Sequence, residues 1–414
     1  MRPSGAAREA TEAPRQRATA TRPACNAGRV KKRTDRGSND VTRTDAGRWI
    51  RDWSVFAAAL RRRVAIRNAA PLCALCLCGF FLAVLVDAAA QSIPTPSAID
   101  VIELEDPRTT TTVSIVPSVG NVAFSMKVNG QELLYWPFDS VAAFKTKPTL
   151  SGIPLLAPFA NRLDETAFYA NGKRYAFDLT LGTVRSPIPI HGFVTSTDRW
   201  QVIEQKTDAT AAWATSRLDF SSEPNWLRQW PFPHTIDVTY RLEGGMLEVR
   251  ARVTNHAADP MPLAIGFHPY FQLTDSPRDE WTIAVGARQR WPLSTSKLPT
   301  GETEPIERLF GNPQAVSLSD HDLDDVFSEL VRDPSGRATL SVRGRKQAID
   351  VLVGPNYRAA VIYAPRGRNF ICFEPMVAVT NALNLAHKGV YRELQSVAPG
   401  ETWQESFWIS PRGY

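Results

Sequence analysis

Residues Ile236–Val253, with the sequence IDVTYRLEGGMLEVRARV, decide how the rest of the chain is interpreted. Apolar and polar residues alternate along Ile236–Leu242, and the same alternation returns along Met246–Val253. A period of two residues is typical of a β-strand that buries one of its faces. Glu243-Gly244-Gly245 lies between the two runs, and glycine readily adopts the backbone angles of a tight turn. The sequence therefore predicts an antiparallel β-hairpin here.

Runs of β-forming residues continue on both sides of this hairpin, and helical periodicity is almost absent from about residue 99 onward. Asn129-Gly130 and Asn171-Gly172 each lie between two such runs, which is a strong signal for a hairpin turn. The expected strands include residues 112–116, 122–128, 133–136, 169–170, 174–177, 338–342, 348–353, 359–363, 370–373 and 403–409. This density of strands predicts an all-β fold, a large antiparallel β-sandwich formed by one domain over residues 99–414.

The positive charge of the chain is concentrated at its N-terminus. Residues 1–68 contain 17 Lys and Arg against 6 Asp and Glu, whereas the whole chain has a net charge of only +6. The segment has few apolar residues and no sustained period, so we expect residues 1–68 to form a disordered basic extension. The remaining residues have a net negative charge, and the sequence therefore gives no reason to expect nucleic-acid binding by the folded domain.

Residues 69–90 have the composition of a secretory signal. Arg61-Arg62-Arg63 precedes an apolar run over residues 69–86, and Ala88-Ala89-Ala90 provides a small-residue cleavage site. Cleavage would place the domain in the periplasm or outside the cell. The alternative is an uncleaved membrane anchor that holds the domain outside the cytoplasm, because 18 apolar residues can just span a bilayer. Only Cys372 follows this segment, so the sequence predicts no disulfide within the domain.

Two of the six histidines occur in settings that suggest function. His191 lies in an apolar run and precedes Gly192, which permits a close backbone approach or a positive φ. His268 lies within the apolar stretch 264–271, where an ionisable ring needs a partner or a function. The other four histidines, which we expect to be structural, are His234, His256, His321 and His387.

Glu374 is the third candidate, since it follows an apolar strand and precedes Pro375. Desolvation would raise the pKa of this carboxyl and make it a useful base near neutral pH. A buried ion pair with Arg162 is the alternative. Asn161-Arg162 follows an apolar, proline-marked stretch, so the guanidinium could be held inward to bind oxygen atoms. Asp324-Asp325 is interpreted as a pair of acids in a loop.

Several other chemistries are not supported by the sequence. The spacings typical of zinc ligands, of an EF-hand, of a serine nucleophile elbow and of a phosphate-binding loop do not occur. Cys372 lies between Ile371 and Phe373, and a thiol buried among apolar side chains is inert. The sequence thus predicts neither a metal nor a cofactor.

Taken in order, five short motifs resemble the aldose 1-epimerase (galactose mutarotase) family. The motifs are Gly152-Ile153-Pro154-Leu155-Leu156 with the nearby Pro158-Phe159 and Asn161-Arg162, then Ile190-His191-Gly192, His268-Pro269-Tyr270-Phe271, Leu323-Asp324-Asp325-Val326-Phe327 and Phe373-Glu374-Pro375. Pro399-Gly400-Glu401 before the last strand also fits. The resemblance covers about residues 100–412, and it implies a galactose mutarotase-like supersandwich with a monosaccharide bound in a groove on one face.

The resemblance also implies roles for individual residues. Glu374 would be the general base that takes the proton of the anomeric hydroxyl, and His268 would be the general acid that protonates the ring oxygen. His191 would form a hydrogen bond near the anomeric carbon or the ring oxygen, as a third catalytic residue. Asp324, Arg162 and the adjacent Asn161 would bind sugar hydroxyls. The expected activity is interconversion of the α and β anomers of a free aldose, with no cofactor.

Two other functions remain open at this stage. A hexose-phosphate 1-epimerase would need a basic cluster for the phosphate, which Arg162, Lys173, Arg174 and Arg185 could supply. A carbohydrate-binding module without catalytic activity is the other alternative, although both an acid and a base are present. The sequence does not indicate which sugar is preferred or how many chains associate.

Overall fold

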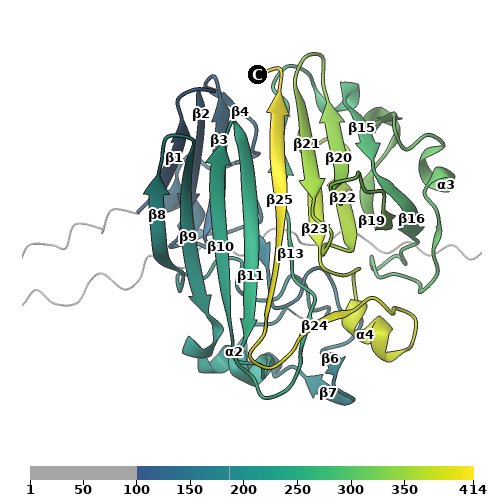
Figure 1. Ribbon diagram of the computed structural model, residues 1–414. Helices are drawn as coiled ribbons and strands as arrows, with labels where there is room; N and C mark the ends of the chain where they lie inside the picture. Colours follow the sequence, from purple (N-terminus) through teal and green to yellow (C-terminus); the bar gives the residue numbers. More distant parts are fainter. Residues whose placement is uncertain (1–99, 186) are drawn as a thin grey trace, which may run out of the picture. The chain divides into compact units, whose positions relative to one another are not determined.

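The computed structural model describes residues 100–185 and 187–414 (Figure 1). The predicted basic extension, residues 1–68, and the predicted signal or anchor, residues 69–90, lie outside the described residues. Within the described ranges, no helix is both long enough and apolar enough to cross a membrane.

Two large antiparallel sheets dominate the described residues, which confirms the expected β-sandwich (Figure 1). The nine-stranded sheet contains, in spatial order, β18 (Val316–Ser317), β15 (Thr282–Val285), β20 (Ala338–Arg343), β21 (Ala348–Val353), β25 (Thr402–Arg412), β11 (Met246–Asn255), β10 (His234–Glu243), β9 (Ala211–Asp219) and β8 (Gln201–Thr207). The eight-stranded sheet contains β17 (Glu304–Pro305), β16 (Ala287–Trp291), β19 (Leu323–Leu330), β22 (Ala359–Ala364), β23 (Ile371–Met376), β13 (Gly266–Phe267) and β5 (Leu155–Leu156), with β14 (Tyr270–Phe271) also paired to β23.

Smaller elements complete the domain. A four-stranded sheet contains β1 (Ile102–Asp106), β2 (Thr111–Val116), β3 (Val122–Val128) and β4 (Gln131–Glu132). Two strand pairs are β6 (Ala167–Ala170) with β7 (Lys173–Ala176) and β12 (Met261–Leu263) with β24 (Gln395–Val397). The α-helices in the described ranges are short: α1 (Val141–Thr146), α2 (Pro224–Gln229), α3 (Glu307–Phe310) and α4 (Ala382–His387).

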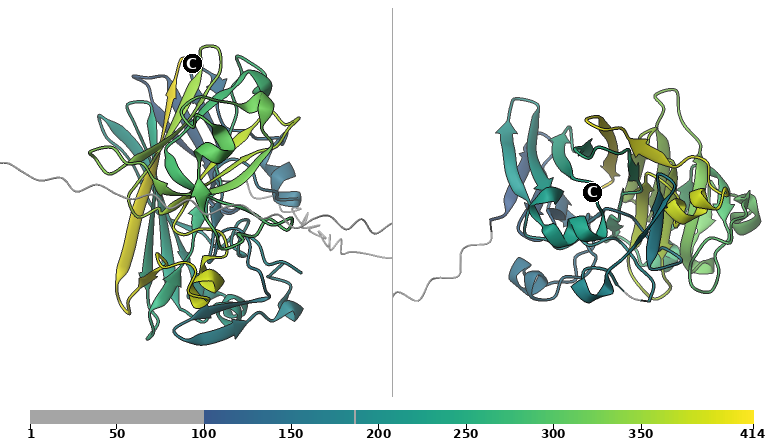
Figure 2. Two further views of the ribbon diagram at one scale, coloured as in Figure 1. Left: turned by 90° about the vertical axis from the view of Figure 1, so that its right-hand side faces the viewer. Right: turned by 90° about the horizontal axis from the view of Figure 1, so that it is seen from below.

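The hairpin predicted from residues 236–253 is formed by β10 and β11. Leu242 pairs with Leu247 and Glu243 pairs with Met246, so the turn consists of two glycines, Gly244 and Gly245, rather than three residues. Their φ angles are 59° and 75°, which glycine adopts without steric cost. The C-terminal strand β25 lies alongside β11, so strands distant in sequence become neighbours in the sheet, as Figure 2 shows.

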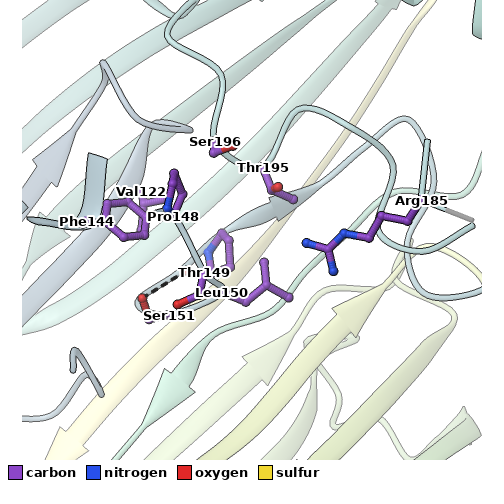
Figure 3. Close-up of a pocket in the computed structure, with 10 residues that line it drawn as sticks. Val122, Phe144, Pro148, Thr149, Leu150, Ser151, Arg185, Thr195 and Ser196 are labelled. Atoms are coloured by element: carbon purple, nitrogen blue, oxygen red, sulfur yellow. Dashed lines mark hydrogen bonds between the residues drawn. The ribbon is translucent and has the colours of Figure 1, made fainter. Parts of the chain in front are cut away.

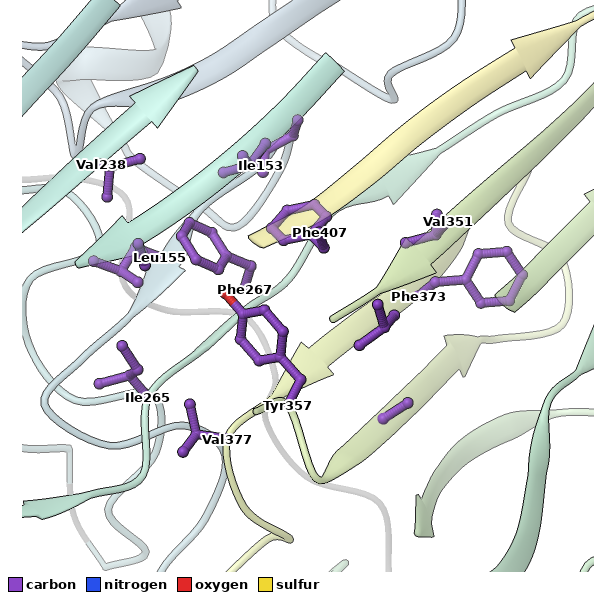
Figure 4. Close-up of a cluster of buried hydrophobic side chains, with 14 of the residues drawn as sticks. Ile153, Leu155, Val238, Ile265, Phe267, Val351, Tyr357, Phe373, Val377 and Phe407 are labelled. Atoms are coloured by element: carbon purple, nitrogen blue, oxygen red, sulfur yellow. The ribbon is translucent and has the colours of Figure 1, made fainter. Parts of the chain in front are cut away.

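The main hydrophobic core lies between the two large sheets (Figure 4). Phe267 of the eight-stranded sheet and Phe407 of the nine-stranded sheet face each other with ring centroids 5.2 Å apart. Side chains alternate along β23, so Ile371 and Phe373 point into this core. Cys372, Glu374 and Met376 consequently point to the opposite face of the sheet, and that face is the one on which the candidate site is built.

Three sequence predictions of local structure are wrong. The run 133–136 is not a strand, because Leu134 forms only an isolated bridge to Phe271 and the pairing with β3 ends at Glu132. Asp324-Asp325 is not in a loop but in β19, where Asp324 pairs with Tyr363 of β22. Glu374 does not end its strand, since β23 continues to Met376. In the last two cases, pairing with a neighbouring strand outweighs the weak strand preference of Asp and Pro.

Candidate active site

His268 lies between β13 and β14 and is almost fully buried, with 5% of its surface exposed. Its backbone N–H donates a hydrogen bond to the carbonyl oxygen of Pro154, at 3.0 Å. Its ring stacks on Tyr270, with centroids 4.7 Å apart and planes within 7°. The backbone bond and the stacking on Tyr270 position the imidazole, and its Nδ1 has no partner among the described residues.

Glu374 lies inside β23 and is 1% exposed. Its Oε1 is 3.2 Å from Nε2 of His268, so the predicted acid and base are in direct contact. Its Oε2 is buried without a hydrogen-bond partner in the described part of the chain. The alternative prediction, a buried ion pair between Glu374 and Arg162, is wrong. Arg162 instead forms its ion-pair contact with Asp324.

His191 completes the set of three, with its ring centroid 5.6 Å from that of His268. Its backbone φ is 63°, and its N–H donates to the carbonyl oxygen of Asn161, at 2.9 Å. Gly192 follows with a φ of 59°, and a Cβ there would lie only 1.9 Å from the carbonyl oxygen of Ala157. Glycine is therefore required at position 192 both for its positive φ and for the close approach to the Ala157 backbone. This turn holds His191 next to the Asn161 segment.

Asp324 occupies a point between two cationic side chains. Its Oδ2 lies 3.7 Å from Nη2 of Arg162 and 3.7 Å from Nζ of Lys297. These distances are too long for hydrogen bonds, so the Asp324 carboxylate attracts both cations without being hydrogen-bonded to either. Lys297 was missed by the sequence analysis, because nothing in its polar surroundings distinguishes it from any exposed lysine.

Asp325 has a different environment from its neighbour. The alternation of β19 turns it to the other side of the strand, where the Arg290 guanidinium donates to its Oδ1 at 2.9 Å. Arg290 also binds Glu304 at 2.6 Å, which completes a charged cluster. The doublet Asp324-Asp325 is thus divided, with one acid at the site and one engaged in a structural ion pair.

Burial governs the protonation of the two central groups. It raises the pKa of Glu374 well above its usual value, and the charge of Asp324 raises that pKa further, whereas Arg162 lowers it. Burial lowers the pKa of His268 to about 3, and Arg162 contributes to that decrease. In the ligand-free pair, burial thus favours the protonated carboxyl of Glu374 and the neutral imidazole of His268.

His191 is held neutral by its surroundings as well. Burial is the largest cause of its pKa lying well below the usual 6.5, and the proximity of His268 comes next. The positive charges of Arg162 and Arg185 lower it further. A neutral imidazole can donate a hydrogen bond from one ring nitrogen and accept one at the other.

Several buried polar atoms without hydrogen-bond partners belong to these residues. In the described ranges they include Nδ1 of His191 and of His268, Oε2 of Glu374 and Nδ2 of Asn161. Each such atom costs about 1–3 kcal/mol of stability when it is left unsatisfied. A polyhydroxylated ligand could satisfy them, whereas no group of three or more metal-binding side chains occurs within residues 100–185 and 187–414.

The remaining histidines and two basic candidates have other environments. His234 is buried, with its Nδ1 2.7 Å from the carbonyl oxygen of Phe232, and His387 stacks on Tyr169. Arg174 binds Glu165 through its guanidinium at 3.0 Å, next to the exposed Lys173 at the tip of the β6–β7 hairpin. Cys372 is fully buried, and burial raises the pKa of its thiol.

Comparison with known proteins identifies a matching family. The family model described as Aldose 1-epimerase matches residues 100–410. Galactose mutarotase from Homo sapiens is 27% identical over 169 residues, and that from Mus musculus is 28% identical over 170 residues. Each of these alignments covers 39% of this chain and 45% of the relative, so the chain matches less than half the length of these curated proteins.

Solved structures show the same fold. A galactose mutarotase-like protein from Clostridium acetobutylicum superposes with a TM-score of 0.67 at 21% identity, covering 76% of this chain and 99% of that one. Galactose 1-epimerase from Lactobacillus acidophilus superposes with a TM-score of 0.63 at 15% identity, covering 77% and 97%. With a family match that extends over nearly all of the described residues, the chain belongs to the aldose 1-epimerase family.

Proposed function

We propose that this protein is an aldose 1-epimerase that interconverts the α and β anomers of a free monosaccharide. The observation that carries the proposal is the buried contact of 3.2 Å between Glu374 and His268. Mutarotation requires one group that accepts a proton and one that donates a proton, both near the anomeric carbon, and this pair holds a single proton between two sites.

The reaction begins when the proton of the pair moves from Glu374 to His268, which leaves a carboxylate beside an imidazolium. The carboxylate takes the proton of the anomeric hydroxyl, and the oxygen forms a carbonyl with C1. The bond between C1 and the ring oxygen breaks, its electron pair goes to that oxygen, and His268 supplies the proton. The product is the open-chain aldehyde, in which C1–C2 can rotate.

Ring closure reverses these transfers on the other face of the carbonyl. His268 takes the proton of the ring hydroxyl, that oxygen attacks C1, and Glu374 returns its proton to the new anomeric oxygen. Because the anomeric and ring oxygens are bonded to the same carbon, two groups in contact with each other can serve both of them. The base and acid need not lie on opposite flanks of the sugar.

The surrounding residues have supporting roles in this proposal. His191, held neutral, donates or accepts a hydrogen bond near C1. Arg162 and Asp324 bind sugar hydroxyls, with Nδ2 of Asn161 as a further donor. Their charges also act on the catalytic pair, since Asp324 raises the pKa of Glu374 and Arg162 lowers it.

We also propose that the enzyme acts outside the cytoplasm, because residues 69–90 have the composition of a secretory signal. N-terminal sequencing of the protein recovered from the exported fraction checks this proposal. A mature N-terminus just after Ala90 supports export with cleavage, and one upstream of residue 69 contradicts cleavage.

The activity is tested by following the optical rotation of freshly dissolved α-glucose and α-galactose with and without the pure protein. We expect clear acceleration, which His268→Gln reduces by about 10²–10⁴-fold. His256→Gln is the matched control, since His256 lies away from this site, with Nε2 3.1 Å from the hydroxyl of Thr235. Sugar binding without any acceleration would instead indicate a carbohydrate-binding module.

A further inference from the structure

The ring of Tyr270 lies face to face with the imidazole of His268. Their centroids are 4.7 Å apart and their planes differ by 7°. This distance is within the range over which the face of an aromatic ring attracts a cation above it. Tyr270 follows His268 by two residues, and the chain enters β14 directly after Pro269, so one short segment carries both rings.

The fold holds Tyr270 in this position. Its backbone N–H donates to the carbonyl oxygen of Gly152, at 2.8 Å, and its own carbonyl oxygen accepts from the N–H of Tyr135, at 2.9 Å. Its side chain is almost fully buried and contacts Phe370, with ring centroids 5.1 Å apart. Tyr270 therefore has little freedom to move away from His268.

A small cavity of about 50 Å³ lies beside the segment that precedes Gly152 (Figure 3). Leu150 and Arg185 are among the residues that line it, and Leu150 also packs against the cluster of side chains that contains Tyr270. Within the described residues, the lining includes none of the three candidate catalytic side chains. The contact that bears on the chemistry is therefore the stacking of Tyr270, and not this cavity.

The other groups that face the His268 ring approach it differently. Glu374 contacts its edge, with Oε1 3.2 Å from Nε2. The rings of His191 and Tyr363 have centroids 5.6 Å and 6.1 Å away and are nearly perpendicular to it, at 75° and 79°. Among the aromatic neighbours in the described residues, Tyr270 is thus the one that lies parallel to the imidazole.

The proposed reaction requires His268 to become positively charged inside the protein. Burial disfavours the charged form by lowering the pKa, and the positive charge of Arg162 lowers that pKa further. Glu374 provides a negative charge only until it takes the proton of the anomeric hydroxyl, because its carboxyl group is then neutral. The ring face of Tyr270 has a permanent partial negative charge, so it attracts the imidazolium throughout this step.

A second pair of the same two residue types provides an internal reference. His387 stacks on Tyr169, with centroids 3.8 Å apart and planes within 3°, and His387 is exposed. The proposed reaction involves no proton transfer by His387, and water solvates an exposed imidazole in either protonation state. Changes at Tyr169 therefore report the effect of weaker stacking where no buried charge has to form.

We infer that Tyr270 is a positioning residue of the candidate active site, whose ring face stabilises the imidazolium form of His268 during ring opening and ring closure. The inference rests on the proposed function and adds a residue to its mechanism. Tyr270 acts through His268 and by its ring, since the ring face, and not the hydroxyl group, covers the imidazole.

The test replaces Tyr270 with phenylalanine and with phenylalanines that have increasing numbers of fluorine atoms on the ring. Fluorine withdraws electron density from the ring face and barely changes its shape, so the attraction for a cation weakens while packing stays nearly the same. Polarimetry with freshly dissolved α-glucose and α-galactose gives kcat and KM for each variant. Relative to Tyr270→Phe, we expect kcat to fall stepwise, by about 3–30-fold at full fluorination, with KM unchanged.

The same series at Tyr169 is the matched control, and we expect its kcat to stay constant. Urea titration checks that the members of each series have equal stability, because a graded loss of folded protein would otherwise imitate a graded loss of rate. A purely structural role of Tyr270 predicts no trend with fluorination, since the shape of the ring is conserved.

A constant kcat along the Tyr270 series, with wild type accelerating mutarotation, would overturn the inference and leave the proposed function intact. Loss of most of the rate already in Tyr270→Phe would also overturn it, because that change removes only the hydroxyl group. An equal stepwise fall in the Tyr169 series would show that the effect is not specific to His268. If wild type accelerates no sugar, the proposed function fails and the inference fails with it.

Discussion

Phe373 and Glu374 are neighbours on β23, and both are almost completely buried, with 0% and 1% of their surfaces exposed. Phe373 points into the core between the two large sheets, where it belongs to the main cluster of buried apolar side chains. Glu374 points to the other face of the same strand, where its Oε1 lies 3.2 Å from Nε2 of His268. Equal burial therefore has opposite consequences for the stability of the fold.

On the inner face, burial of a large aromatic side chain contributes about 1.5–3 kcal/mol to stability. On the outer face, burial shifts the pKa of Glu374 upward and that of His268 downward, and it leaves polar atoms without partners. Buried polar atoms without partners lower the stability of the folded state. The fold tolerates them because apolar burial on the inner face contributes a larger, favourable free energy. One sheet thus provides stability on one side and a reactive surface on the other.

Glu374→Gln gives the largest expected effect, on rate rather than stability. Loss of the carboxylate removes the proposed base, so we expect the mutarotation rate to fall by about 10²–10⁴-fold. The denaturant midpoint is expected to stay the same or rise, because a buried ionisable group is replaced by a neutral one of similar shape. Polarimetry and urea titration measure the two quantities. A variant that retains the full rate would show that Glu374 is not the base.

Phe373→Ala is the complementary change on the inner face. Truncation of a fully buried phenylalanine leaves a cavity, and we expect a loss of about 3–5 kcal/mol in the free energy of unfolding. The folded protein is expected to retain most of its mutarotation rate, because the Phe373 side chain points away from the candidate site. A small stability loss combined with a large fall in rate would contradict the division between the two faces.

The pH dependence of stability sharpens the same comparison. Because the pKa of Glu374 is raised in the folded state, the folded protein keeps a proton that the unfolded chain loses above about pH 4.5. The contribution of Glu374 to the free energy of unfolding therefore declines as the pH rises above 4.5. The stability of Glu374→Gln relative to wild type is therefore expected to increase with pH from about 4.5, by at most about 1.4 kcal/mol per pH unit.

His268→Gln is expected to show the opposite trend. The pKa of His268 is about 3 in the folded state and 6.5 in the unfolded state, so this residue makes wild type gain stability as the pH rises from 3 to 6.5. Its replacement removes that gain, and the stability relative to wild type falls over this window. Urea titrations at several pH values check both trends, and parallel curves for the two variants would contradict the assignment.

Asp324→Asn and Asp325→Asn give the smallest expected effects, and they separate two adjacent acids. Asp324→Asn is expected to raise the KM for the sugar several-fold with little change in stability, because that carboxylate is partly exposed and loosely paired. Asp325→Asn is expected to cost about 1–3 kcal/mol in stability through its bond with Arg290, with KM unchanged. A larger KM effect for Asp325→Asn would reverse the assignment.

Local sequence was informative where a short segment determines its own structure. The period of two in residues 236–253 predicted the β10–β11 hairpin, since alternation and glycine turns act within a few residues. His191, His268 and Glu374 could be named because a polar residue in an apolar run is conspicuous, and the structure brings all three together. Their catalytic roles remain predictions.

Other features depended on partners far away in the chain. Lys297, which approaches Asp324, gave no local signal, and the cavity beside Arg185 is lined by segments up to 74 positions apart, from Val122 to Ser196. The strand at Asp324-Asp325 exists because β22 pairs with it, in spite of two residues that disfavour strands. Such outcomes depend on long-range pairing, which local preference does not encode.

The sequence alone determined that residues 99–414 form an all-β domain with ionisable residues embedded in apolar runs, because alternation and hydrophobicity are properties of neighbouring residues. Only the tertiary structure decided that Glu374 contacts His268, that Asp324 and not Asp325 faces the site, and that Arg185 borders a cavity. The physical reason is that contacts and pKa shifts depend on distance and burial in space, which strand register and sheet packing set.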